Sequence, residues 1–261
     1  MQHHEDSIAA FVERTRQDPR VLGIVLDGSV ASGRERPDSD VDLILIMSEG
    51  AFADAWRDNQ LMRVEREGVT YEGGYYDIKL GSVGYLQRAA DRADDPTRAA
   101  LLDARVVWSR IDGLEELVAA VPRLPDEAWE QRMASFIAQV RLHQGYFLRQ
   151  AAEHDNHFLL HHAATHLVGA GGRALLALNR TFFQGQKYLD QTLAGLERVP
   201  DGYAAAARAV LDDPGPQTGG RYRDLIESYH PWPLSDDETL STFLRGNELG
   251  WYSGEAPTEY S

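Results

Sequence analysis

The sequence contains no cysteine, so neither a disulfide nor a thiolate metal site is available to it. It also lacks any apolar run near the roughly 20 residues that a membrane-spanning helix needs. The stretch from Met1 to Asp6 is polar and acidic, which does not match the basic and apolar pattern of a secretory signal. These absences lead us to expect a cytoplasmic protein with no membrane partner.

Positive charge is also scarce. The chain has 26 Lys and Arg residues against 41 Asp and Glu residues, which gives a formal net charge of −15. A negative chain without a basic stripe repels the phosphate backbone, which argues against nucleic acid as a partner. The charge would suit a cationic small molecule, although acidity also favours solubility by itself. Because only Lys79 and Lys187 are lysines, we expect a lysine to mark a place that needs a compact positive charge.

The 261 residues suit two modest domains or one large one. Before Pro125, short apolar runs typical of strands alternate with helical patterns, and after it only helical patterns follow. Pro122 and Pro125 read as a linker. We therefore predict an α+β chain with one domain over residues 1–125 and an all-helical bundle domain over residues 126–261.

Several elements can be placed from the pattern. In the first domain we expect a helix over 7–17 with Ser7 as its N-cap, buried strands over 21–26 and 41–47, a hairpin of 61–66 with 69–71, and a strand over 75–80. In the second domain we expect helices over 127–153, 156–178 and 187–198.

The most informative stretch is the turn from Gly28 to Gly33 followed by Ser39-Asp40-Val41-Asp42-Leu43. A Gly-Ser turn can present backbone N–H groups to phosphate, and carboxylates can hold a hard divalent cation. Residues i and i+2 of a strand point to the same face, so Asp40 and Asp42 direct their carboxylates into one small volume. Without a cation there, their mutual repulsion would be costly.

A third acid lies in the strand predicted over 75–80. Asp77 stands among aromatic and β-branched residues, where an aspartate is disfavoured unless it has a partner or a function. Lys79 is two residues further on and therefore shares its face.

The stretch resembles the signature of the nucleotidyltransferase superfamily that includes DNA polymerase beta, G-S-x-A-x-G followed by S-D-x-D-L. The matching residues are Gly28, Ser29, Ala31, Gly33, Ser39, Asp40, Asp42 and Leu43, and Ser32 stands where many small members have Arg. The resemblance implies a mixed sheet flanked by helices, with ATP as the nucleotide donor and two Mg²⁺ ions held by Asp40, Asp42 and a third carboxylate on the neighbouring strand. Asp77 is the candidate for that third acid, and Gly28, Ser29 and Ser39 are the candidates for binding the nucleotide.

A second resemblance concerns the segment from Phe182 to Asp190. It is similar to part of the helical domain of bacterial antibiotic adenylyltransferases, notably the streptomycin/spectinomycin group, in which a lysine near a helix start reaches the nucleotide phosphates. The matching residue is Lys187, and the alternative for it is an exposed lysine on a surface helix.

Together the two resemblances imply transfer of a nucleoside monophosphate, AMP from ATP, to a hydroxyl of a small molecule such as an aminoglycoside or lincosamide. The general base stays open among Glu72, Glu153 and Asp155. An alternative rests on Arg149 and His154, whose R-x4-H spacing resembles the motif of HEPN ribonuclease domains. It would make the chain a toxin–antitoxin protein that modifies a protein or RNA.

Five histidines cluster in the second domain: His154, His157, His161, His162 and His166. The i, i+4 pairs among them could chelate a transition metal, but packing between helices explains the pattern more simply.

Overall fold

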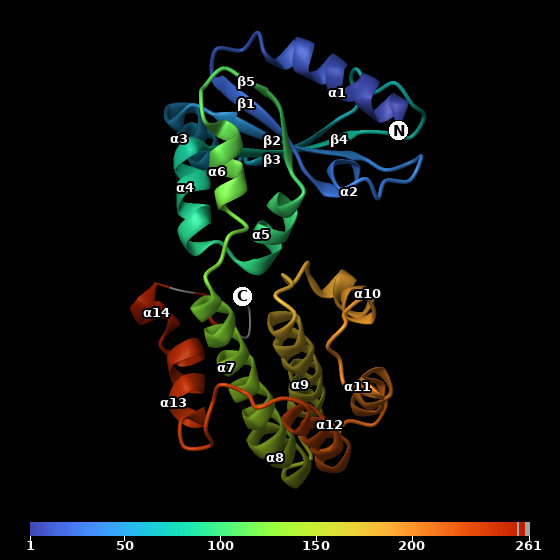
Figure 1. The fold of residues 1–261 in the computed structure, drawn as a ribbon, viewed down its shortest axis with the longest axis vertical. Helices are drawn as coiled ribbons and strands as arrows, with labels where there is room; N and C mark the ends of the chain where they lie inside the picture. Colours follow the sequence, from blue (N-terminus) through green and yellow to red (C-terminus); the bar gives the residue numbers. More distant parts are fainter. Residues whose placement is uncertain (255, 259–261) are drawn as a thin grey trace. The chain divides into compact units, whose positions relative to one another are not determined.

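The computed structural model describes residues 1–254 and 256–258. It divides into two compact units, Met1–Arg123 and Leu124–Ser261 (Figure 1). In chain order, the first unit contains α1 (Gln2–Thr15), β1 (Val21–Leu26), α2 (Gly28–Ala31), β2 (Val41–Met47), α3 (Glu49–Arg57), β3 (Met62–Glu65), β4 (Tyr76–Ser82), α4 (Val83–Arg92), α5 (Asp95–Leu102), β5 (Arg105–Ser109) and α6 (Leu114–Ala120).

The five strands form one sheet in the order β3-β4-β2-β1-β5. β2 and β4 run parallel, whereas the other three neighbouring pairs are antiparallel. The sheet is therefore mixed, as predicted. Because β1 and β2 lie inside it and are covered on both faces, they can be continuous apolar runs rather than alternating ones.

Helices cover both faces of the sheet (Figure 1). On one face, Ile8 and Phe11 of α1 pack against residues such as Ile24 and Leu43 of β1 and β2. On the other face, α4, α5 and α6 pack against β1 and β2 through a second apolar cluster. The strands are packed between these two apolar clusters, which hold the carboxyl end of β1 and the start of β2 in place.

Two predictions for this unit are wrong. The first helix begins at Gln2 rather than at residue 7, and Ser7 is buried inside it, where its hydroxyl donates to the His3 carbonyl at 2.8 Å. Residues 69–71 form no strand, because β3 pairs with β4 instead. Thr70 is hydrogen-bonded to Ser7 and His3 of α1, so tertiary contacts replace the expected hairpin pairing.

The second unit contains helices and no strand among its described residues. In chain order they are α7 (Asp126–Leu142), η1 (His143–Leu148), α8 (Arg149–Glu153), α9 (His157–Leu178), η2 (Gln186–Tyr188), α10 (Leu189–Ala194), α11 (Tyr203–Asp212), α12 (Pro216–Tyr229), α13 (Thr239–Phe243), η3 (Leu244–Glu248) and α14 (Gly250–Ser253). The helix expected over 127–153 is thus continuous but includes the π-helical segment η1. The helix expected over 187–198 ends earlier, at Ala194.

One apolar cluster, to which α7, α9 and α12 contribute, forms the core of this helical unit. The mixed sheet followed by a helical region confirms the predicted α+β class. None of the described helices is long and apolar enough to cross a membrane.

Candidate active site

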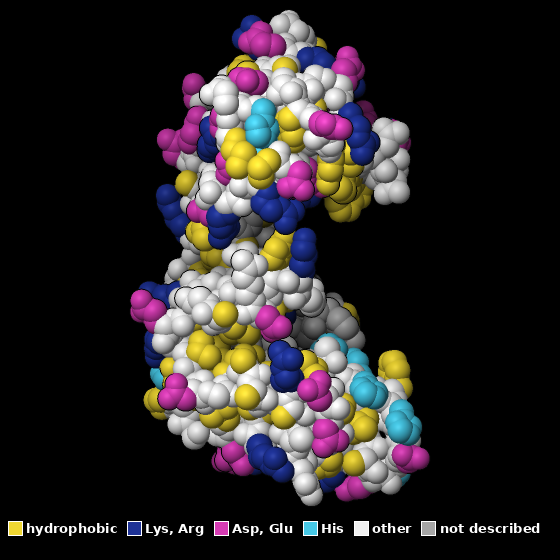
Figure 2. All heavy atoms as spheres, turned by 90° about the vertical axis from the view of Figure 1, so that its right-hand side faces the viewer, with side chains coloured by type: hydrophobic (Ala, Val, Ile, Leu, Met, Phe, Trp, Pro, Cys, Tyr) yellow, Lys and Arg dark blue, Asp and Glu magenta, His cyan; other side chains and the backbone are white. Residues whose placement is uncertain are grey.

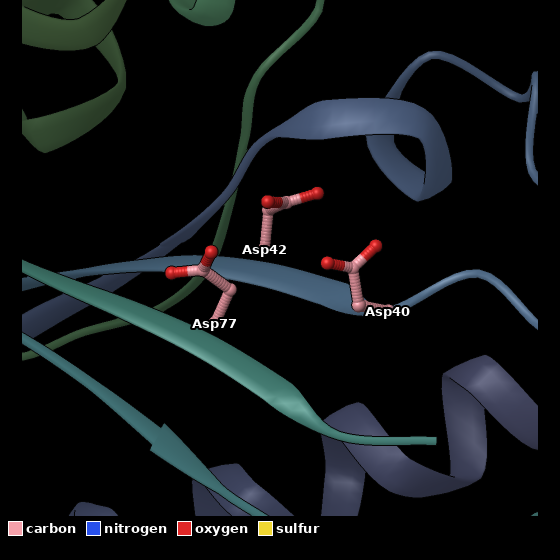
Figure 3. A group of neighbouring side chains, drawn as sticks. All are labelled: Asp40, Asp42 and Asp77. Carbon is pink, nitrogen blue, oxygen red and sulfur yellow. The ribbon is translucent and has the colours of Figure 1, made fainter. Parts of the chain in front are cut away.

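Three carboxylates lie together at one end of the parallel strand pair β2 and β4. Asp40 immediately precedes β2, Asp42 is its second residue, and Asp77 is the second residue of β4. Each offers one oxygen such that all three atoms lie within 4.8 Å of one another. In Figure 3 the three side chains rise from the same side of the two strands toward a shared space.

Strand geometry explains this convergence. Asp40 and Asp42 share a face because they are two residues apart in extended backbone. Asp42 is directly opposite Asp77 in the parallel register, so the third carboxylate reaches the same face from the neighbouring strand. Pairing of β2 with β4 therefore brings Asp42 and Asp77 together, although they are 35 residues apart in the sequence.

The site concentrates negative charge in a partly buried place. Burial raises the pKa of Asp42 to about 7, and repulsion from Asp27 and Asp40 adds to the rise. One oxygen of Asp77, Oδ1, is buried and has no hydrogen-bond partner among the described residues. Since Mg²⁺ prefers carboxylate oxygens, a divalent cation would supply the missing charge, and these three residues fit it.

The turn after β1 lies directly against this cluster. Gly28 has a φ of +69°, and a Cβ atom there would meet Asp42 Oδ2 at 2.0 Å, so only glycine fits. The Asp27 N–H donates to the Asp42 carbonyl at 3.1 Å, which ties the turn to β2. Ser29, the second residue of α2, is half-buried in the same turn. The turn therefore holds Gly28 against Asp42, and Ser29 is the next residue along it.

Ser39 has a different setting. It is buried, and its hydroxyl accepts a hydrogen bond from the Arg36 N–H at 2.9 Å. Its carbonyl accepts hydrogen bonds from the Tyr71 hydroxyl at 2.5 Å and from His4 Nε2 at 3.2 Å. These contacts fix the loop that leads into Asp40.

The remaining candidates divide between the two units. Glu72 is exposed in the loop before β4, in the same unit as the three acids. Glu153 forms an ion pair with Arg149, and Asp155 forms one with His157, both within the helical unit. Lys187 is exposed in η2 of that unit, with its Nζ 5.0 Å from the ring centroid of Tyr188.

The histidines of α9 gather on the surface of the helical unit (Figure 2). Together with Phe158 and Thr165 they line a shallow hollow of about 500 Å³, to which His157, His161, His162 and His166 contribute. Their rings pack on one another, with His162 and His166 only 4.2 Å apart between centroids. Among the described residues, the one group of three or more ligand atoms placed to hold a metal ion is that of the three aspartates, and metal binding by a pair of these histidines stays a prediction.

Sequence reasoning missed three residues around the site. Asp27 is buried next to Gly28, and His4 and Tyr71 hold the Ser39 carbonyl. For Asp27 a signal was present in the sequence, because an acid is unusual between a buried strand and a Gly-Ser turn. His4 and Tyr71 gave none, since only the tertiary fold brings them to the loop.

The comparison with protein families identifies one domain, which includes most of the first unit. Residues 8–137 match the family model described as "Nucleotidyltransferase domain". No curated protein matches the chain. Among solved structures, the chain is similar to the nucleotidyltransferase-like protein from Exiguobacterium sibiricum, with 14% sequence identity, coverage of 96% of this chain and 78% of that chain, and a TM-score of 0.46.

Proposed function

The chain carries a nucleotidyltransferase domain over residues 8–137 and is a transferase, and we propose that it moves AMP from ATP to a hydroxyl group of a small molecule. The observation that carries this proposal is the convergence of Asp40, Asp42 and Asp77 beside the Gly28 turn. A cation site next to a turn that can bind phosphate is what transfer of a nucleoside monophosphate requires.

In the proposed reaction, the acceptor oxygen forms a bond to the α-phosphorus of ATP. The bond between that phosphorus and the bridging oxygen breaks, pyrophosphate leaves, and the hydroxyl proton passes to a base. Two Mg²⁺ ions bound by Asp40, Asp42 and Asp77 would stabilise the charge on the attacking and leaving oxygens. Glu72 is the candidate base that belongs to the same unit as the three acids.

The triphosphate would be bound by two kinds of group. The backbone N–H groups and hydroxyl at Gly28 and Ser29 are the candidates beside the acids, with Ser39 shaping the loop. Lys187 is the candidate for a compact charge contributed by the helical unit. This assignment follows the resemblance to the streptomycin/spectinomycin adenylyltransferases.

The acceptor would be a cationic molecule with hydroxyl groups, such as an aminoglycoside or a lincosamide antibiotic. The net charge of −15 supports a cationic partner, because acidic surfaces raise the local concentration of cations.

The test is release of pyrophosphate from ATP with a panel of hydroxylated antibiotics, in the presence of Mg²⁺. We expect release only when an acceptor is present, loss of at least about 100-fold in rate for Asp42→Asn, and a higher KM for ATP in Lys187→Met. Asp112→Asn is the matched control, because Asp112 is an exposed aspartate of the same unit.

Two outcomes would contradict parts of the proposal. Binding of ATP without pyrophosphate release across the panel would rule out the antibiotic acceptor. Transfer of labelled nucleotide to protein or RNA, or ribonuclease activity lost in His154→Ala, would favour the alternative based on Arg149 and His154.

A further inference from the structure

Asp27 is a buried acid that the proposed function leaves unused. It follows β1 directly and occupies the N-cap position of α2, yet its side chain caps no N–H group of that helix. The residue is only 3% exposed, and its Oδ1 has no hydrogen-bond partner among the residues that the structure describes. Removing a carboxylate from water is unfavourable unless charges or hydrogen bonds compensate it, so this one calls for a compensating charge.

The sheet register places Asp27 in line with two of the three acids. Leu26 is opposite Leu43, so Asp27 comes opposite Asp42, and Asp42 is opposite Asp77 on the next strand. Residues opposite each other across neighbouring strands point to the same face. Asp27, Asp42 and Asp77 therefore form a row across the ends of three neighbouring strands.

The charges of these groups act on one another. The negative charges of Asp77 and Asp40 contribute to raising the pKa of Asp27, after burial as the main cause, and Asp27 in turn raises the pKa of Asp42. Lys79 is the positive side chain that opposes this rise. It is exposed, so water screens its charge, and it offsets the rise only in part.

We propose that Asp27 is a fourth acidic residue of the cation site, one that strengthens cation binding from its place next to Asp42 in this row. The inference rests on the proposed function, because it assigns Asp27 to the same site. Asp27 does not belong to the group whose oxygens lie within 4.8 Å of one another, so it supports the ligands and does not join them. Its negative charge, next to Asp42, adds to the attraction that the three ligands exert on a cation.

The experiment is a titration of the metal-free full chain with Mn²⁺ alone, followed by electron paramagnetic resonance of the free ion. It compares wild type with Asp27→Asn, Asp42→Asn and the control Asp112→Asn, which removes the same charge at an exposed turn. Asp112→Asn should bind like wild type, and Asp42→Asn should lose the site. Asp27→Asn should bind about 10–100-fold more weakly, as outer partners of metal ligands generally do when they are removed.

Wild-type affinity in Asp27→Asn would overturn the inference, even if that variant changed the stability of the metal-free protein. The proposed function would then still stand, provided that Asp42→Asn lost the site. Failure of wild type to bind Mn²⁺ would overturn both proposals together. Circular dichroism checks that each variant is folded, and Asp27→Ser takes the place of Asp27→Asn if the latter does not fold.

Discussion

Replacing Gly28 with alanine tests the packing of the turn against the acids. The new Cβ would lie 2.0 Å from Asp42 Oδ2 and 2.6 Å from Asp42 Cγ, whereas ordinary contacts begin at 3.4 Å. The carboxylate must therefore move by about 1.4 Å. It cannot simply swing aside, because its own Cβ, fixed in β2, is only 3.0 Å away.

The structure provides a matched control for the backbone. Gly33 has nearly the same φ, +68° against +69°, but a Cβ there meets nothing within 4 Å. Both alanine variants should lose about 1–2 kcal/mol of stability, because the left-handed conformation is strained for alanine. Only Gly28→Ala displaces Asp42 as well.

We expect Gly28→Ala to bind Mn²⁺ at least about 10-fold more weakly than Gly33→Ala in the absence of nucleotide. Its rate of pyrophosphate release should fall about 100-fold, the cost typical of a 1 Å misplacement of a reacting group. Thermal unfolding measures the shared strain separately. If the two variants bind Mn²⁺ equally, the clash with Asp42 is not what requires glycine at this position.

Three further perturbations follow from buried polar groups. Because the pKa of Asp42 is raised from 3.8 to about 7, the folded metal-free protein loses stability as the pH rises from about 4 to about 7, where only the unfolded chain ionises this group. Asp42→Asn should therefore recover about 1–2 kcal/mol at pH 8 and nothing near pH 4, measured by urea unfolding with EDTA. A matching gain at both pH values would contradict this. Burial lowers the pKa of His143 from 6.5 to about 3. The contribution of the neutral ring to the stability of the fold is therefore present above pH 6.5 and is lost as the pH falls toward 3. Between pH 8 and pH 5 the free energy of unfolding of the wild type should fall by about 2 kcal/mol more than that of His143→Gln. Equal losses would refute the assignment. Arg98 is fully buried and donates hydrogen bonds to the carbonyls of Ala93, Ala90 and Val121. Arg98→Met should therefore lower the free energy of unfolding by about 3 kcal/mol or more. A loss below about 1 kcal/mol would show that these carbonyls find other donors.

The strands that carry the acids were predictable because their sequence is simple. The runs over 21–26 and 41–47 are apolar without alternation, which strands covered on both faces require. Asp77 stood out as the one acid in a strand that is mostly apolar and aromatic. The prediction of a hairpin was wrong because residues 69–71 have strand-forming side chains but are hydrogen-bonded to α1 through Ser7. Local propensity has no means of registering such a distant partner.

The sequence by itself determined the spacing of Asp40 and Asp42 on one face and the glycine-serine turn before them, because both depend on neighbouring residues only. It also determined that an acid lies in the strand of Asp77. The tertiary structure decided that Asp77 stands directly opposite Asp42, because the register of a parallel pair joins segments 35 residues apart. It also decided that Asp27 is buried beside them and that Gly28 must be glycine. Both depend on how closely the turn packs against β2, and no pattern along a single chain encodes that distance.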